Sequence, residues 1–371
     1  MKFSDIALAR KRDDEQEYTL HLFEKCNLSC GFCWQDHTAF EGVDTVRDKL
    51  KPVCEFLDAE TKKKVTINVM GGEVFDDSIF DDKLFEDYVY LSTEIRDYAA
   101  TKGIEIKINF VSNLVTEHPS RISKLMDTLS ALDVRNTLVT SYDSRGRFNK
   151  HQFKTFKDNV ELLRGYIASV SMLLTKPVIK QLMERQDPYF QWLYENGFEI
   201  YFDYYTPTVE NKNPATESEA VVSTVIAPSD LDLLKVFYFF IDNYPNVQPI
   251  KAWIENGSNS LSCRQSKLVL ADGTKCLCGN LQLKDEQSVR FYNAKIKPSD
   301  NSEIEKNFID RWDCLSCEYF ERCQLGCFMQ HDYAARGQMV ECPFKLTFDK
   351  ITKGIVVDTD KIKTYFGKKQ K

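Results

Sequence analysis

The stretch YTLHLFEKCNLSCGFC, residues 18–33, decides the fold class and points to the chemistry. Its first part has the apolar pattern of a buried strand, which predicts a β-strand over Tyr18–Phe23. The strand runs into Cys26, Cys30 and Cys33, a C-x3-C-x2-C spacing. Three thiolates in one loop can bind three irons of a cubane cluster and leave the fourth iron open to a ligand. A zinc knuckle is the alternative, but no fourth zinc ligand stands at a usual offset.

Beyond this strand, short apolar runs alternate with longer amphipathic stretches. We predict further strands over Val65–Met70, Ile104–Ser112, Thr137–Ser141, Ala168–Leu174 and Glu199–Tyr205. We predict helices over Val43–Leu57 (interrupted at Pro52), Asp82–Ala100, Pro119–Leu132, Lys150–Ile167, Val178–Glu195 and Leu231–Tyr244, the last capped by Ser229. Six β-α repeats imply parallel strands and are fewer than a closed eight-stranded barrel needs. The expected fold is α/β, a partial (β/α)6 TIM-like barrel whose site lies at the carboxyl ends of the strands.

Composition excludes several classes of protein. The chain has 371 residues, 43% of them apolar and 28% charged, so it can bury a sizeable core. Its net charge of −7 argues against a nucleic-acid partner. No apolar run approaches the length of a membrane helix and no signal peptide opens the chain, so we expect a cytoplasmic protein. In that reducing compartment its 12 cysteines indicate metal or redox chemistry rather than disulfides.

The cysteine loop after the first strand, with Phe32 before its last cysteine, resembles that of the radical S-adenosylmethionine (SAM) superfamily. The resemblance covers nearly the whole chain. It implies that Cys26, Cys30 and Cys33 bind a [4Fe–4S] cluster whose open iron binds the amino and carboxylate groups of SAM. An electron from the cluster then cleaves SAM to a 5′-deoxyadenosyl radical, which abstracts a hydrogen atom from the substrate.

The second and third strands end in residues that fit this resemblance. Gly71, Gly72 and Glu73 follow the second strand and look like the family's GGE motif, which contacts the SAM amino group. Glycines allow a close approach of the backbone, and a carboxylate suits an ammonium group. Asn113, at the end of the third strand, is similar to the family's polar tip at that point.

The fourth and fifth strands supply the remaining expected SAM contacts. Ser141 and Asp143 resemble the S-x-D-G turn of relatives, with Ser144 in place of glycine, and imply contacts to the ribose or carboxylate of SAM. Capping of the next turn is the alternative role for Ser141 and Asp143. Several relatives place a basic residue on the fifth strand for the SAM carboxylate. Here that strand has Ser171 and no arginine, so Ser171 is the expected contact.

A second cysteine array follows residue 250. Its spacing, C-x9-G-x4-C, then C-x2-C-x5-C-x3-C, then C, resembles the SPASM domain, which carries two auxiliary [4Fe–4S] clusters. Two structural zinc sites are the alternative. By the family's connectivity, the first auxiliary cluster takes Cys263, Cys278 and Cys327, and the second takes Cys314, Cys317, Cys323 and Cys342.

One further ligand completes the first auxiliary cluster. A cubane held by protein alone takes four thiolates, so three clusters with one open iron need about eleven. Cys276, two residues before Cys278, would point to the same side of a strand and is the expected fourth ligand. Cys54 is then left over, and its helical pattern predicts a buried, inert thiol.

The expected organisation is an N-terminal extension over 1–17, the barrel over 18–248, the SPASM domain over 249–350 and a C-terminal tail over 351–371. Strand alternation places Asp203 on a face that lines the cavity, as a candidate base for a substrate radical that loses an electron and a proton. An ordinary hydrogen-bonded aspartate is the alternative. An auxiliary cluster would accept the electron.

The resemblance implies an oxidoreductase that oxidises or cross-links a residue in a ribosomal precursor peptide or a protein. We expect the lateral gap of the open barrel to hold the peptide by β-addition. Further expected partners are a reductant such as flavodoxin or ferredoxin and a separate leader-peptide-binding protein. The alternatives are radical oxidation of a small molecule such as an aminoglycoside and, as a different class, a ferredoxin-like electron carrier.

Overall fold

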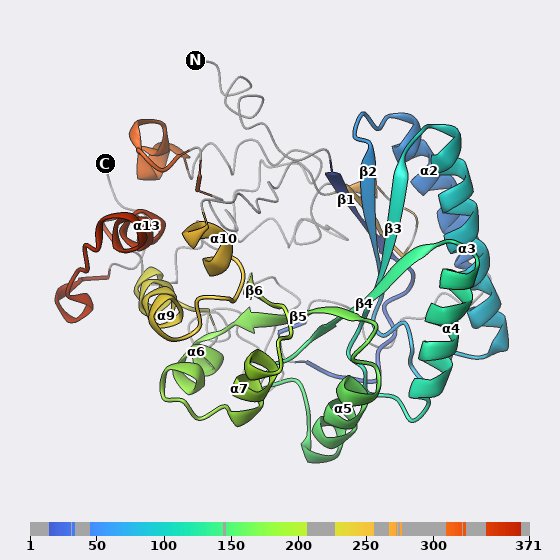
Figure 1. The fold of residues 1–371 in the computed structure, drawn as a ribbon, viewed down its shortest axis with the longest axis horizontal. Coiled ribbons are helices and arrows are strands. Elements are labelled where there is room, and N and C mark those ends of the chain that lie inside the picture. The colour runs from blue at the N-terminus through green and yellow to red at the C-terminus, as the bar shows by residue number, and fades with distance from the viewer. Residues whose placement is uncertain are drawn as a thin grey trace, which may run out of the picture.

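One curled sheet organises the molecule (Figure 1). The structure is a computed structural model that describes residues 15–30, 32–33, 45–143, 146–205, 227–255, 267–271, 273, 275–276, 309–320, 322–323 and 339–364. Within these ranges the strand order is β6-β5-β4-β3-β2-β1-β7-β8. Neighbours pair in parallel except β7 and β8, which are antiparallel. The strands are β1 (Glu15–His21), β2 (Lys64–Met70), β3 (Glu105–Ser112), β4 (Arg135–Ser141), β5 (Ile167–Leu174), β6 (Ile200–Tyr204), β7 (Lys267–Val269) and β8 (Lys275–Cys276).

Helices cover the outer side of this sheet, and the last three of them pack on one another beyond its β6 edge (Figure 1). They are α2 (Leu50–Asp58), α3 (Asp82–Thr101), α4 (Pro119–Ala131), α5 (Lys150–Leu162), α6 (Lys176–Met183), α7 (Pro188–Glu195), α9 (Asp230–Asn243), α10 (Ile250–Ile254) and α13 (Pro343–Lys353), with 3-10 turns η2 (Arg47–Lys49), η5 (Cys314–Ser316) and η6 (Thr359–Lys361). The predicted partial α/β barrel is confirmed. It has seven parallel strands rather than six, because β7 pairs with β1; β7 has three residues, too few for a visible alternation.

The two faces of the sheet differ in polarity. Ile67 and Ile108 face the helices and are fully buried. The opposite, concave face carries Asn68, Asn109 and Thr137, on three neighbouring strands. There Asn109 Nδ2 donates to Asn68 Oδ1 at 2.9 Å, and Thr137 Oγ1 donates to Asn109 Oδ1 at 2.6 Å. Alternation along each strand therefore gives an apolar outer core and a polar barrel interior.

Two predicted helices are corrected by the positions of prolines. The helix predicted over Val178–Glu195 is two helices, because Pro188 cannot continue α6 and instead begins α7, with Asp187 as its N-cap. Pro52 does not interrupt its helix: it lies in the first turn of α2, where no helical hydrogen-bond donor is required. Ser229 caps α9 as predicted, with a capping box to Asp232.

The described residues of the C-terminal segment pack mainly against the core of the barrel. Buried Ile309, Tyr319 and Phe348 belong to the same apolar cluster as the strands, and α13 packs on α9. The backbone N–H of Met339 donates to Asp230 Oδ2 at 3.0 Å, at the start of α9. Helix α13 runs past residue 350, the expected domain boundary, and Ile362 of the expected tail packs on α9 side chains. None of the helices in the described ranges is long and apolar enough to cross a membrane.

Candidate active site

The cysteine loop is attached to the sheet by backbone hydrogen bonds that continue the pairing of β1 with β2. The N–H of Gly72 donates to the carbonyl of Phe23 at 2.8 Å, and the N–H of Glu73 donates to the carbonyl of Lys25 at 2.9 Å. A turn follows, in which the N–H of Cys33 donates to the carbonyl of Cys30 at 3.0 Å. These hydrogen bonds therefore place the thiols at the carboxyl end of the barrel.

Gly71 and Gly72 are required by this attachment. A Cβ at Gly71 would lie 2.7 Å from the carbonyl oxygen of Phe23, and one at Gly72 would lie 1.9 Å from that of Lys25. The expected reason for glycine was close approach of SAM. In the structure the close approach is that of the cysteine loop itself, although both glycines also line the cavity described below.

Glu73 is buried at 2% exposure and points into the protein. Its carboxylate accepts hydrogen bonds from Ser112 Oγ at 2.7 Å and from the backbone N–H groups of Asn113 at 2.6 Å and Phe75 at 2.9 Å. Burial raises its pKa to about 7, and the three hydrogen bonds oppose that rise. Glu73 thus ties the end of β2 to the end of β3.

Asn113 connects β3 to the cysteine loop. Its Nδ2 donates to Asn27 Oδ1 at 2.8 Å and lies 3.8 Å from Cys26 Sγ as a weak donor. The N–H of Leu28 donates to the same sulfur at 3.4 Å, and Asn27 Nδ2 donates to the carbonyl of Val115 at 2.6 Å. Hydrogen bonds to a thiolate of this kind tune the reduction potential of an iron–sulfur cluster.

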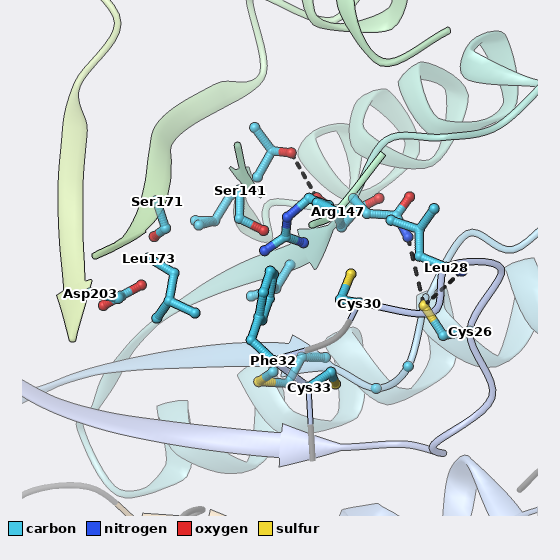
Figure 2. A pocket seen from close by; sticks show the side chains of 18 of the residues that line it. Cys26, Leu28, Cys30, Phe32, Cys33, Ser141, Arg147, Ser171, Leu173 and Asp203 are labelled. Carbon is cyan, nitrogen blue, oxygen red and sulfur yellow. Dashed lines mark hydrogen bonds between the residues drawn. The ribbon is translucent and has the colours of Figure 1, made fainter. Parts of the chain in front are cut away.

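The three thiols line a cavity of about 370 Å³ at the carboxyl ends of the strands (Figure 2). The expected site residues that the structure brings together there are Cys26, Cys30, Phe32, Cys33, Gly71, Gly72, Asn113, Ser141, Ser171 and Asp203. Glu73 and Asp143 are not among its lining residues. Both are buried behind the wall, at 2% exposure each. Their direct contact with SAM stays a prediction.

Burial sets the acidity of the thiols. It raises the pKa of Cys26 to about 12, with a further rise from the Glu73 carboxyl. It raises the pKa of Cys30 to about 11, a rise that the Arg147 guanidinium opposes. Free thiols of this kind stay protonated at neutral pH, whereas a bound metal deprotonates a coordinating thiol. The donor set therefore fits metal-bound thiolates better than a free cysteine nucleophile.

Asp203, on β6, lines the cavity together with Ser171, on β5 (Figure 2). The side chain is exposed toward the open cavity, and the protein atoms around it reduce its hydration. This desolvation raises the pKa of Asp203 to about 6, while the interaction with Ser171 opposes the rise. Tyr205 lies on the same stretch and also lines the cavity, as the strand alternation predicts.

The sequence interpretation missed Arg147, a basic residue that lines the cavity from the loop between β4 and α5. Its Nε and Nη2 each lie 2.7 Å from Asp143 Oδ2. The sequence did not single out Arg147, because Arg145 stands in the same loop and a loop has no period that tells which arginine lines the cavity.

Four cysteines of the C-terminal segment surround a second, smaller cavity. Cys314, Cys317, Cys323 and Cys342 line it together with Trp312, Tyr319, Phe320, Lys345 and Phe348. Cys314 and Cys317 come from the turn η5 and its end, and Cys342 is the N-cap of α13. These are the four cysteines grouped above for one auxiliary cluster, and their role as ligands stays a prediction.

Most of the other expected auxiliary ligands are not among the described residues. Cys263, Cys278 and Cys327 lie outside the described residues, and Cys276 is placed only as part of β8. Cys54 lies half-buried on α2, away from both cavities. Across the described residues, no three His, Cys, Asp or Glu side chains are gathered to hold a single metal ion.

Solved structures share this fold. A tagged form of the protein described as "anSMEcpe with bound AdoMet" matches with a TM-score of 0.58 at 16% identity, over 92% of this chain and 97% of that one. "Native anSMEcpe with bound AdoMet and Cp18Cys peptide" matches with a TM-score of 0.57 at 13% identity, over the same shares. No protein-family model and no curated protein matches the chain. At this identity the likeness shows the fold, which is the predicted one.

Proposed function

We propose that this chain is a radical SAM enzyme with three [4Fe–4S] clusters, which cleaves SAM reductively and oxidises or cross-links one residue of a peptide or protein. One observation carries the proposal: the thiols of a C-x3-C-x2-C loop line a single cavity at the carboxyl ends of a partial barrel. The SAM in the two solved structures of this fold supports the same ligand here.

The residues of the cavity fit both groups. Cys26, Cys30 and Cys33 would bind three irons of the first cluster, held in place by the hydrogen bonds to the loop. The backbone at Gly72 and the side chain of Asn113 face the space beside them. When bound, the cluster and SAM supply a 5′-deoxyadenosyl radical that removes a hydrogen atom from the substrate. The cavity volume, about 370 Å³, lies at the lower end of the range for small-molecule sites.

A cavity of that volume has room for one residue of a substrate that enters from outside. It has less room for a second small molecule enclosed beside SAM. The peptide named with the second solved structure supports the same class. Both edges of the parallel sheet carry further backbone pairing among the described residues: β8 pairs with β7, and Gln248 pairs with β6. This pairing favours entry of the peptide toward the polar interior, which we propose, while β-addition at the barrel edge stays a prediction.

Asp203 is the proposed base. Its pKa of about 6 leaves the carboxylate mainly ionised at neutral pH. The carboxylate lines the same cavity as the cysteine loop. An ionised carboxylate in that place can accept the proton that a substrate radical releases on oxidation. Ser171, on the neighbouring strand, favours the ionised form of this carboxylate.

Two other functions remain open to test. Radical oxidation of a small molecule would use the same cavity and cysteine loop. A ferredoxin-like carrier would need neither the barrel nor an open iron, and the cavity beside the thiols disfavours it. The proposal also includes a flavodoxin- or ferredoxin-type reductant, a separate leader-peptide-binding protein and a cytoplasmic location.

The deciding experiment uses anaerobically reconstituted full-length protein. With reductant, SAM should yield 5′-deoxyadenosine, and iron analysis should give about twelve irons per chain. A perdeuterated candidate peptide should transfer deuterium into 5′-deoxyadenosine, and a carbohydrate should not. Native protein that holds zinc and no iron would refute the radical mechanism. Deuterium transfer from a carbohydrate or free amino acid alone would refute only the peptide substrate.

A further inference from the structure

A third cavity lies outside the active site, between the end of β4 and the helices α5, α6 and α7. Its volume is about 210 Å³, which suits one inserted side chain better than a whole small-molecule ligand. We call it the aromatic pocket, because its walls include the rings of Tyr142, Phe148, Phe153 and Tyr189. None of the residues that line it also lines the cysteine-loop cavity. The aromatic pocket is therefore a separate site.

Asp187 lines this pocket and is 5% exposed. Its Oδ1 accepts hydrogen bonds from the Tyr142 hydroxyl at 2.8 Å and from the N–H of Phe190 at 2.9 Å. Its Oδ2 is buried and has no hydrogen-bond partner among the described residues. The other carboxylate of the pocket, Asp143, is paired with Arg147. Asp187 is therefore a buried carboxylate that keeps one oxygen for a further donor.

The described contacts of Asp187 do not require its charge. As the N-cap of α7 it needs only a side-chain oxygen, which asparagine supplies equally well. The hydrogen bond from Tyr142 likewise needs only an acceptor. Burying a carboxylate without a cation costs free energy, and the dipole of the eight-residue helix α7 offsets only part of that cost. A ligand of opposite charge gives the carboxylate a function.

The rest of the pocket also suits a cation. The Tyr189 hydroxyl is buried and has no hydrogen-bond partner among the described residues, so its oxygen can accept from a ligand. The Tyr189 ring lies edge-on to those of Tyr142 and Phe153, with ring centres 5.1 and 5.4 Å apart, and aromatic rings attract cations. Lys157 already lies 5.0 Å from the Phe153 ring centre. Lys150 lines the pocket as well, but it is exposed, so water screens its charge.

We propose that the aromatic pocket binds a basic side chain, the guanidinium of arginine or the ammonium of lysine, through Asp187 and the Tyr189 hydroxyl. Both cationic groups carry only N–H donors, which match these two acceptors. The source of the side chain is the substrate peptide, and this choice rests on the proposed function. Asp143 lines the aromatic pocket and bonds Arg147, which lines the cysteine-loop cavity, so one peptide can reach both.

The first test uses two probes of nearly equal shape, Nα-acetyl-arginine amide and the neutral Nα-acetyl-citrulline amide. Their dissociation constants are measured by ligand-observed NMR on iron-loaded, full-length protein, kept anaerobic and without reductant. The arginine probe should bind with a dissociation constant of about 1 mM. The citrulline probe should bind at least about tenfold more weakly, because it lacks the charge that Asp187 pairs with.

Two variants then assign the contacts. Asp187→Asn keeps the helix cap and removes the charge, so it should weaken the arginine probe about tenfold or more without lowering the melting temperature. Tyr189→Phe should weaken it about 2- to 10-fold. The matched control is Asp81→Asn at the N-cap of α3, where Asp81 accepts from the N–H of Leu84 at 2.9 Å. It should leave binding unchanged.

Three results would overturn the site: equal binding of the two probes, unchanged binding in Asp187→Asn, or a gain above about tenfold in Lys150→Gln. The last would show that Lys150 itself occupies the pocket, whereas removal of a screened charge should strengthen binding by no more than about threefold.

The source is tested with the peptide that transfers deuterium to 5′-deoxyadenosine. Replacing its basic residues one at a time by citrulline should raise KM at one position with kcat unchanged, and Asp187→Asn should abolish that difference. If no position raises KM, the peptide is not the source. The probes bind without radical chemistry, so protein that binds them but does not cleave SAM would overturn the proposed function and leave the cation site standing.

Discussion

The two cysteine cavities are built in different ways. Around Cys26 the loop is fixed by hydrogen bonds to the ends of β2 and β3, through Gly72, Glu73 and Asn113. Around Cys323 the thiols come from short turns and a helix N-cap, and the walls are aromatic side chains such as Tyr319 and Phe348. The first set is aligned by a regular sheet, and the second by side-chain packing on a shared core.

This difference predicts which of the two cavities needs its bound cluster in order to fold. Hydrogen bonds attach the first loop to the ends of β2 and β3, so we expect its cluster to contribute chemistry more than stability. The second cavity lies in a segment with few regular elements among the described residues, where cluster binding and folding are coupled.

The largest expected effect comes from replacing Cys26, Cys30 and Cys33 together with alanine. SAM cleavage should be lost entirely, since no thiolate then holds the cluster that carries the open iron, and about four of twelve irons should disappear. The fold should persist, and its circular dichroism should match the parent. The Cys54→Ala control should leave both activity and iron content unchanged. Retained SAM cleavage in the triple variant would contradict the site.

The comparison is sharpened by two single substitutions at equally buried thiols, Cys323→Ser and Cys30→Ser, at 8% and 9% exposure. Cys323→Ser should lower the melting temperature of the iron-loaded protein by about 4–8 °C, which corresponds to about 3–6 kcal/mol for a chain of 371 residues. Cys30→Ser should lower it by about 2 °C or less. If the two shifts were equal, the structural distinction between the two cavities would be wrong.

A smaller effect is expected from Gly72→Ala. The added Cβ would meet the Lys25 carbonyl oxygen at 1.9 Å, which forces the cysteine loop away from β2. We expect about 1–3 kcal/mol of destabilisation, typical of overpacking, together with weaker iron binding. Gly165→Ala is the matched control, because no atom lies within 4 Å of its added Cβ. Chemical denaturation of both variants measures the difference, and equal stability would refute the attachment.

The smallest expected effect is a pH dependence at Asp203. Its pKa is about 6, above the ordinary 3.8, so product formation should rise as pH increases through about 6 and then level off. The same shift means that the fold favours the protonated form: this stabilisation is complete below about pH 3.8 and is lost as pH rises through 6. Asp203→Asn should still cleave SAM, yield little product and lose this step. An unchanged pH profile in that variant would remove Asp203 as the base.

Much of the fold was predictable, because periodicity and capping are local signals. The strands from β2 to β6 lie within two residues of their predicted bounds, and Ser229 begins α9 as expected. The split at Pro188 was also readable and was missed, since the apolar pattern continues across it. Strand β7 was not readable: three residues carry no period, and its pairing with β1 joins segments about 250 positions apart.

The candidate site shows the same contrast between local sequence signals and long-range contacts. Cysteine spacing, the Gly-Gly-Glu run and the alternation that turns Asp203 inward are properties of contiguous residues, so the chain alone specifies which groups belong together. Which way each group points is a matter of long-range contacts. Glu73 turns into the protein because Ser112 and Asn113, on another strand, supply its hydrogen bonds. Arg147 faces the thiols because Asp143 and Phe32 hold it from two separate loops. Burial and pairing of charge depend on neighbours that only folding brings together.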